Sequence, residues 1–349
     1  MNIACLKLKR EAKQETSFMK NGGLLLEELI AFCNGKSNPI RNFSAKELRK
    51  ATNNYDPSQR FLWAADFAFY KGSLEDRLIS VKVYWEGVYG DYQDKILDCI
   101  IKDIAVGSQM SAHKNVLKLL GCCLETRLPI LVYEFVGEKI LSNCIRQIDR
   151  LNSQPLPWKC RLRIAMGIAN AVAYLHTAFS RPVVHRDIQS PTIILDEDNV
   201  ARLNDFSLSI SIPEGQLHAE DAVRGRMGYA YIDPEYWTSG HVTEKTDVFS
   251  FGVFLLDLFA GFKLNSTPHW IHSASSLPEW VKSYDEQNRL NEIVDPVLLE
   301  ERIDQEQLLA FAKLSLSCMR DKGEDRPGII EVAKQLRRIF QSAMHTTLT

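Results

Sequence analysis

The sequence predicts an α+β fold in two parts, a small β-rich part followed by a larger helical part. Between residues 61 and 135, short runs rich in aromatic and β-branched residues alternate with turn residues, a pattern typical of antiparallel strands. After Val136-Gly137 the pattern changes, and most segments repeat apolar residues at the 3.6-residue spacing of helices. The 349 residues are 45% hydrophobic and 25% charged, which indicates a globular protein and excludes disorder and collagen.

Charge and cysteine usage narrow the class of protein. The 42 Lys+Arg and 44 Asp+Glu residues give a net charge of −2, which argues against a nucleic-acid-coating or polybasic membrane protein. The eight cysteines include no Cys-x-x-Cys pair, which is typical of reduced thiols in the cytosol. We expect neither a membrane span nor a secretory signal, and therefore a cytoplasmic protein, with recruitment to the plasma membrane by partners left open.

Residues 1–42 are expected to form a basic segment and a helical extension ahead of the main body. The extension carries one apolar stripe at helical spacing, made of Leu25, Leu26, Leu29, Ile30 and Cys33. Asn34-Gly35 then ends the helix. The stripe fits two alternatives equally, docking on the chain's own domain or in the groove of a partner.

The small part is expected over residues 43–135. Ser44 and Glu47 have the spacing of a capping box, and Phe43 and Leu48 that of a hydrophobic staple, so a helix starts at Ser44 and ends near residue 53. Strands follow at residues 61–84, 116–123 and 130–135, with a helix at 91–110 between the first two groups. The turn between the first strands is expected at Asp76-Arg77.

The large part is expected over residues 136–342, with a tail at 343–349. Its strongest helical pattern spans residues 161–176. Further helices are predicted at residues 246–260, 277–286, 305–319 and 329–342.

Seven short motifs follow one another along the chain. They are Val81-Lys82, Val132-Tyr133-Glu134, His185-Arg186-Asp187, Asp205-Phe206, Asp233-Pro234-Glu235, Asp247 to Gly252, and Asp325-Arg326-Pro327. Each motif alone is weak evidence for any family, but together they resemble a eukaryotic protein-kinase domain over about residues 43–340. The resemblance implies a bilobal kinase-like fold, in which Asp247, Gly252 and Arg326 hold the large lobe together.

The resemblance can be narrowed. The residues Phe43-Ser44-x-x-Glu47-Leu48 and Leu119-Leu120-Gly121-Cys122-Cys123 are similar to plant receptor-like and receptor-like cytoplasmic kinases. The preceding Asn21-Gly22-Gly23-Leu24 and Cys33-Asn34-Gly35-Lys36 are similar to one branch of these, the ZRK-type pseudokinases. That likeness implies an adapter for a coiled-coil plant immune receptor with leucine-rich repeats.

The glycine-rich loop that covers the phosphates in kinases is missing. Residues 61–68, which stand at its place, contain no glycine, and Trp63 and Phe67 add bulk there. Without glycine the backbone cannot easily bring its amides against a triphosphate.

The strand lysine and its partner are changed in part. Lys82 matches the lysine that binds nucleotide phosphates, and Asp103 best matches its partner on the following helix, where glutamate is usual. Aspartate is one methylene shorter than glutamate, so it is in question whether Lys82 and Asp103 form an ion pair. The alternative is two solvated surface charges. Tyr133 and Glu134 match nucleotide-pocket positions, Tyr133 that of the gatekeeper.

The catalytic loop keeps Asp187 but loses two of its partners. Gln189 stands where the family has lysine, and Thr192 where it has a metal-binding asparagine. Gln189 carries no positive charge for the transferring phosphoryl group, and Thr192 offers a hydroxyl in place of an amide oxygen.

The metal-binding motif is altered as well. Asp205 could hold Mg²⁺, but Ser207 replaces the glycine that follows the phenylalanine in the family. For Asp187 and Asp205 we favour a structural role, accepting hydrogen bonds that organise their loops, over catalysis.

Two surfaces are candidates for partner binding. Arg186, Arg224 and Arg226 could cluster around an anion of a modified or phosphorylated partner kinase, the alternative being a solvated loop. By resemblance, the helical extension that carries Leu29 and Ile30 is expected to face the repeats of the immune receptor.

The sequence therefore predicts a catalytically impaired pseudokinase that requires no cofactor. By resemblance, it links an NLR immune receptor to effector-modified receptor-like cytoplasmic kinases in plant immunity, without binding nucleic acid. The alternative is a weakly active serine/threonine kinase in which Lys82, Asp187 and Asp205 still use ATP with Mg²⁺ or Mn²⁺.

Overall fold

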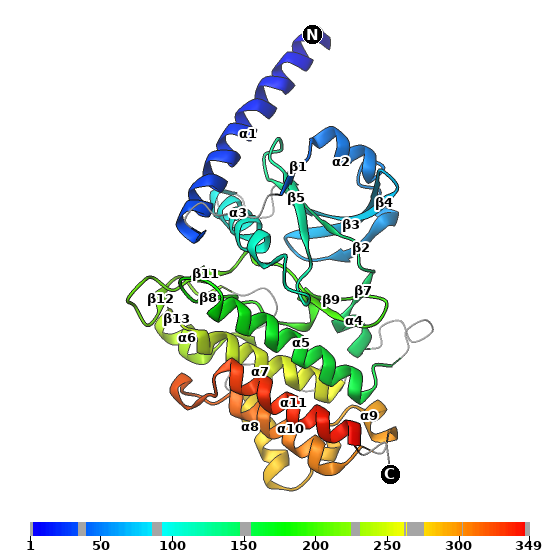
Figure 1. Cartoon of the computed structure of the whole chain (residues 1–349), viewed down its shortest axis with the longest axis vertical. Helices are drawn as coiled ribbons and strands as arrows, with labels where there is room; N and C mark the ends of the chain where they lie inside the picture. The colour runs from blue at the N-terminus through cyan, green and yellow to red at the C-terminus, as the bar shows by residue number, and fades with distance from the viewer. Residues whose placement is uncertain are drawn as a thin grey trace. The chain divides into compact units, whose positions relative to one another are not determined.

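The computed structural model describes residues 3–33, 40–85, 93–146, 155–224, 231–261, 263, 276–301 and 303–345 (Figure 1). The chain divides into two units. The first unit is Met1–Glu138 with Asp205–Ser207, and the second is Lys139–Asn204 with Leu208–Thr349. The main division thus falls after Glu138, whereas the sequence places it after Phe135. The N-terminal extension belongs to the first unit.

A six-stranded sheet forms the centre of the first unit. Its strands are β1 (Arg41–Asn42), β2 (Arg60–Trp63), β3 (Phe67–Leu74), β4 (Arg77–Tyr84), β5 (Leu119–Cys123) and β6 (Ile130–Glu134). They lie in the order β1-β5-β6-β4-β3-β2, and all pairs are antiparallel except β1 with β5. Glu75 and Asp76, both with positive φ, form the turn between β3 and β4, one residue before the predicted position.

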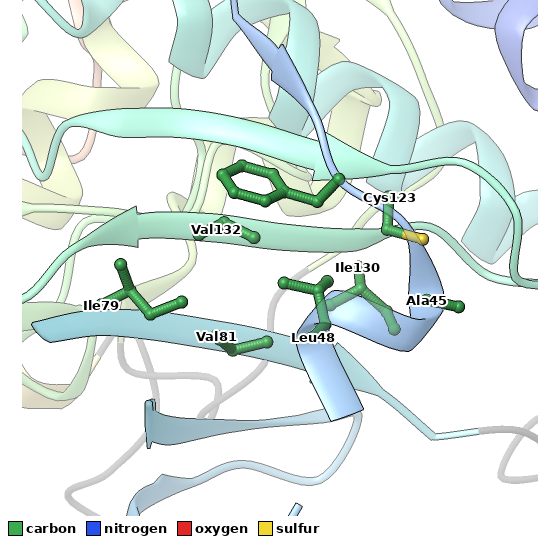
Figure 2. Packing of buried hydrophobic residues seen from close by; sticks show 8 residues of the cluster. Ala45, Leu48, Ile79, Val81, Cys123, Ile130 and Val132 are labelled. Carbon is green, nitrogen blue, oxygen red and sulfur yellow. The ribbon is translucent and has the colours of Figure 1, made fainter. Parts of the chain in front are cut away.

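Helix α2 (Ala45–Ala51) covers one face of this sheet. Its capping box is present as predicted: the Ser44 Oγ accepts from the Glu47 backbone N–H, and the Ser44 backbone N–H donates to Glu47 Oε2 at 2.9 Å. Figure 2 shows Ala45 and Leu48 beside apolar side chains of β4, β5 and β6, namely Ile79, Val81, Cys123, Ile130 and Val132. All of these side chains are buried.

Helix α1 (Ile3–Cys33) is longer than predicted and packs against α3 (Gln93–Met110) (Figure 1). The buried Asn21 Nδ2 donates to the carbonyls of Leu124 and Thr126, which fixes α1 to the β5–β6 connection. Leu25 is buried, so part of the predicted apolar stripe docks on the chain's own unit. Leu26 and Ile30, in contrast, are 59% and 54% exposed.

The second unit is mainly helical, with short antiparallel strand pairs. Its helices are α4 (Leu141–Arg146), α5 (Trp158–Thr177), α6 (Pro234–Ser239), α7 (Glu244–Ala260), α8 (Ser276–Glu286), α9 (Pro296–Glu300), α10 (Gln305–Cys318) and α11 (Ile329–His345). Its strands are β7 (Lys139–Ile140), β8 (Val183–Val184), β9 (Ile193–Leu195), β10 (Ala201–Leu203), β11 (Ile210–Ser211), β12 (Ala219–Glu220) and β13 (His241–Val242). A β-rich first unit and a helical second unit confirm the α+β prediction.

The core of the second unit surrounds α7, which is buried along nearly its whole length and packs against α5 and α10. Gly252 permits the contact with α10, because a Cβ there would lie 2.7 Å from the Met319 side chain and 2.8 Å from that of Cys318. Arg326 pairs with Asp233 at 2.7 Å, and both side chains are buried. No helix in the described ranges has the length and hydropathy that a bilayer span requires.

Asp247 organises the segment that contains Asp187. Its carboxylate accepts from the backbone N–H groups of His185 and Arg186, both at 2.8 Å, and lies 2.7 Å from His176 Nε2. Burial raises the pKa of Asp247, but the hydrogen bonds and charges of its partners outweigh burial, so its pKa is lowered overall. Asp247 is therefore an ionised buried carboxylate that fixes the backbone before Asp187.

Candidate functional site

Lys82 lies on β4 with its ammonium wholly enclosed in the first unit. Its Nζ is 2.7 Å from Asp103 Oδ2 and 3.1 Å from Asp205 Oδ1, and all three side chains are fully buried. Aspartate at position 103 therefore reaches the lysine despite its shorter side chain. The alternative of two solvated surface charges is wrong.

Asp103 is held by three further donors. The Tyr84 hydroxyl donates to its Oδ2 at 3.0 Å, and the Tyr133 hydroxyl lies 3.4 Å from the same oxygen. The Phe206 backbone N–H donates to Oδ1 at 2.8 Å. Burial, and then the negative charges of Asp103 and Asp205, raise the pKa of Tyr133 well above its usual value. Its hydroxyl thus stays protonated as a donor.

Aromatic rings surround the Lys82 ammonium. Its Nζ lies 4.2 Å from the ring centroid of Phe67, 4.9 Å from that of Tyr84 and 5.9 Å from that of Phe69. A cation over a ring face is stabilised by the ring's quadrupole. Phe67 begins β3, at the place where the sequence lacks the glycine-rich loop, so a side chain covers the lysine where kinases keep an open backbone.

The turn before Phe67 is a tight connection between β2 and β3. The Ala64 N–H donates to the Phe67 carbonyl at 2.9 Å. Trp63, the other bulky residue at the missing loop, is 69% exposed and stacks with the Arg60 guanidinium, whose Cζ lies 4.5 Å from the ring. Of the two bulky side chains, Phe67 is therefore the one beside the lysine.

Asp205 is surrounded by donors at the oxygen that faces Lys82. Oδ1 of Asp205 also accepts from the Ser207 hydroxyl at 2.6 Å and from the Ser207 N–H at 3.3 Å. The residue that replaces glycine thus adds a hydroxyl donor to this carboxylate. A divalent cation at Oδ1 would have to displace both the ammonium and this hydroxyl, so this oxygen of Asp205 does not fit a metal ligand.

In the second unit the catalytic-loop residues form hydrogen bonds with one another. Gln189 Nε2 donates to Asp187 Oδ1 at 2.7 Å, and the Thr192 hydroxyl donates to the Gln189 carbonyl at 2.9 Å. All three side chains are buried. Asn204 Nδ2 donates to the Thr192 carbonyl at 2.7 Å, which ties the loop to the end of β10. These bonds organise the loop and supply no positive charge for a phosphoryl group.

Arg186 does not line an open anion site, contrary to the expectation from the sequence. Its side chain is 1% exposed, and its Nη1 donates to Asp221 Oδ2 at 2.9 Å and to the Tyr236 hydroxyl at 3.2 Å. Arg224 Nη2 lies 3.6 Å from the other oxygen of Asp221. Burial raises the pKa of Asp221, but the two arginines outweigh it and lower the pKa overall. The anion beside Arg186 is thus part of the chain, and Arg226 lies outside the described residues.

The remaining predicted residues lie on β6 and α1. The Glu134 N–H donates to the Lys118 carbonyl at 3.0 Å, and its carboxylate accepts from the Lys118 N–H at 3.2 Å. Leu29 is half-buried and Ile30 exposed.

Two residues of this arrangement are not predicted from the sequence. Tyr84 stands two positions after Lys82, and the two-residue period of a strand could have placed both on one face. Asp221 gives no such signal, because it lies 35 positions from Arg186 and in no motif.

Comparison with known proteins agrees with the geometry. Residues 69–336 match the family of protein tyrosine and serine/threonine kinases. The chain is 41% identical to the non-functional pseudokinase ZED1 of Arabidopsis thaliana, over 95% of this chain and 98% of that one. It is 38% identical to the serine/threonine-protein kinase ZRK1 (97% and 96% covered) and 38% identical to the non-functional pseudokinase ZRK2 (95% and 91%), both of Arabidopsis thaliana. The chain belongs to the protein-kinase family and, within it, to the ZRK family of plant receptor-like cytoplasmic kinases.

Proposed function

We propose that this protein is a catalytically impaired pseudokinase that serves as an adapter in plant innate immunity. In this role it links an NLR receptor to receptor-like cytoplasmic kinases that a pathogen effector has modified. The observation that carries the loss of catalysis is the buried pairing of Lys82 with Asp205 at 3.1 Å beneath the ring of Phe67, in which the charge expected for phosphates and the charge expected for metal neutralise one another.

The catalytic loop adds to this impairment. Phosphoryl transfer relies on positioned positive charge, and neither Gln189 nor Thr192 supplies a charge or an amide ligand for a metal. Losing two such contacts at ~2 kcal/mol each would slow transfer roughly a thousandfold. The covered lysine adds a further barrier, because a nucleotide would have to displace the aromatic side chains around it.

The adapter role rests on the family and on an exposed apolar face of α1. Met19, Leu26 and Ile30 are 69%, 59% and 54% exposed, and their spacings of seven and four residues place them on one side of the helix. The opposite side is occupied, because Asn21 and Leu25 dock on the first unit. The exposed face therefore offers a preformed helical surface for the repeats of a receptor.

Co-precipitation tests the adapter role. The full chain is co-expressed with coiled-coil NLR receptors of its source plant, as the wild type and as Leu26→Glu with Ile30→Glu, a pair chosen because Leu29 is half-buried. We expect the double variant to capture at least about tenfold less receptor than the wild type, since each carboxylate would be desolvated in the interface. Leu217→Glu, at a residue that is 90% exposed in the second unit, is the matched control and should capture receptor normally. Equal capture by all three proteins would remove α1 from the interface.

A weakly active serine/threonine kinase is the second candidate. Lys82, Asp187 and Asp205 are all present, and the relative ZRK1 is named a serine/threonine-protein kinase. An active protein of this family would use ATP with a divalent metal. A phosphate-transfer assay separates the two candidates, since only the kinase loses activity when Asp187 is replaced.

A further inference from the structure

Three metal-binding side chains meet on the ribbon formed by β12 and β13 in the second unit. They are His218, Glu220 and His241, and one ligand atom from each lies within 4.8 Å of those of the other two. None of them belongs to the phosphoryl-transfer positions described above.

The strand register places these side chains together. Ala219 of β12 is paired with Val242 of β13, and Glu220 is paired with His241. Directly opposed residues share a face of the ribbon, and so do residues two apart on one strand. Glu220 and His241 therefore share one face, and the ring of His218, the residue before β12, lies on the same side because it stacks on that of His241.

The other face of the ribbon anchors it to the second unit. Ala219 and Val242 are buried in an apolar cluster with Val184, Ile212 and Tyr236. The Asp221 N–H donates to the Gly240 carbonyl at 3.3 Å, and Arg186 holds the Asp221 carboxylate. The backbone under the three side chains is thus fixed on its inner side, while the side chains themselves face outward.

The distances are close to those of a coordination sphere. The Nε2 atoms of both histidines face the same oxygen, Glu220 Oε1, at 3.9 Å for His218 and 4.0 Å for His241. The two imidazole rings are stacked with centroids 4.0 Å apart. Ligands bonded to zinc at 2.0–2.1 Å in a tetrahedron lie about 3.4 Å apart. The three ligand atoms, now within 4.8 Å of one another, must therefore approach by up to roughly 1.4 Å, and the stacked imidazole rings must turn toward a common point.

We propose that His218, Glu220 and His241 form a binding site for a divalent transition-metal ion of the zinc class. Two imidazole nitrogens and one carboxylate oxygen suit Zn²⁺, with water as the fourth ligand. Mg²⁺ does not suit the site, because it prefers six oxygen ligands. Because Glu220 lies on β12, His218 directly before it and His241 on β13, a bound ion cross-links the two strands.

Zinc titration of the metal-free full chain tests the site. Calorimetry with ZnCl₂ should show one ion bound per chain, and Mg²⁺ at the same concentration should give no heat. His218→Ala with His241→Ala should weaken zinc binding by more than about tenfold, since only one of the three ligands remains. Glu220→Gln, which keeps the size of the side chain, should weaken it less. His345→Ala, at an exposed histidine at the end of α11, is the control and should bind zinc as the wild type does.

Two further measurements distinguish this site from zinc bound elsewhere. Zinc should raise the melting temperature of the wild type and leave that of the double variant unchanged, because only a cross-linked ribbon gains stability from the ion. Co²⁺ in the same site should give an absorption spectrum without a thiolate charge-transfer band. Absence of zinc binding by the wild type, or equal binding by the double variant, would overturn the proposal, and so would a thiolate band with Co²⁺.

Discussion

The Lys82 ammonium lies 3.1 Å from the Asp205 carboxylate, so the lysine expected to bind phosphates is paired with the aspartate expected to bind a metal. Asp103 completes the group at 2.7 Å, and water reaches none of the three side chains. In an active kinase the pairing of this lysine with the acidic residue of the helix is itself required, whereas the metal-binding aspartate must be available to Mg²⁺. Here Asp205 is instead paired with Lys82, and the ring of Phe67, at the place of the missing phosphate-binding loop, lies 4.2 Å from the ammonium.

Replacing Lys82 should destabilise the fold itself. Lys82→Met leaves Asp103 and Asp205 buried together without a counter-charge, which should lower the unfolding free energy by about 4 kcal/mol. Urea unfolding followed by circular dichroism measures the change. Lys71→Met is the control: its Nζ is 3.0 Å from Glu138, but the pair is partly exposed and should cost under about 1 kcal/mol. Equal stability of the Lys82 and Lys71 variants would contradict this structural role.

Asp247 should make stability depend on acid pH. Its folded pKa is lowered below the unfolded value, so its contribution is fully present above about pH 4 and is lost as the pH falls through the folded pKa. Asp247→Asn should cost about 3 kcal/mol at pH 7, because an amide cannot accept from all three donors that the carboxylate serves.

The pH series gives the decisive comparison for Asp247. The difference in unfolding free energy between wild type and Asp247→Asn should shrink steadily below pH 4. A difference that stays constant from pH 7 down to pH 3 would show that the charge of Asp247 contributes nothing.

Buried thiols should resist alkylation. Burial raises the pKa of Cys122 to about 12 and that of Cys318 to about 12, so almost no reactive thiolate exists at pH 8. Iodoacetamide followed by peptide mapping should leave both residues unmodified in the folded protein and modify both in urea. Rapid modification of Cys122 in the folded protein would mean that the packing around β5 opens readily.

Restoring the family's residues in the two loops should not restore catalysis. The triple variant Gln189→Lys, Thr192→Asn and Ser207→Gly regains a charge, an amide ligand and a glycine, but Phe67 still covers Lys82. We expect phosphate transfer by this variant to stay at background. Transfer by this variant that a further Asp187→Ala substitution abolishes would show that the covered lysine is no barrier.

Much of the fold follows from local patterns. The capping box at Ser44 and the helical spacing of residues 161–176 depend on neighbouring residues, and α2 and α5 appear where these patterns predict them. Which face of α1 is buried is harder to predict. Leu25 and Leu26 are equally apolar, and only contact with the first unit determines that Leu25 is buried and Leu26 exposed.

The state of the site depends on contacts between distant residues. The motifs identify Lys82 and Asp205, but their pairing joins positions more than a hundred residues apart. A motif also cannot show that Asp221 occupies the Arg186 guanidinium, because the partner lies outside every motif. The sequence therefore predicts which catalytic groups are missing, and the structure shows how the retained ones are bound.

Transfer of radiolabelled phosphate from ATP tests the central claim most directly. The folded full chain is incubated with Mg²⁺ or Mn²⁺, alone and with a generic basic protein, beside Asp187→Ala and Asp205→Ala variants as controls for contaminating kinases. The account predicts that the wild type incorporates no more phosphate than either variant. Incorporation by the wild type that both substitutions abolish would contradict the account and establish the protein as an active kinase.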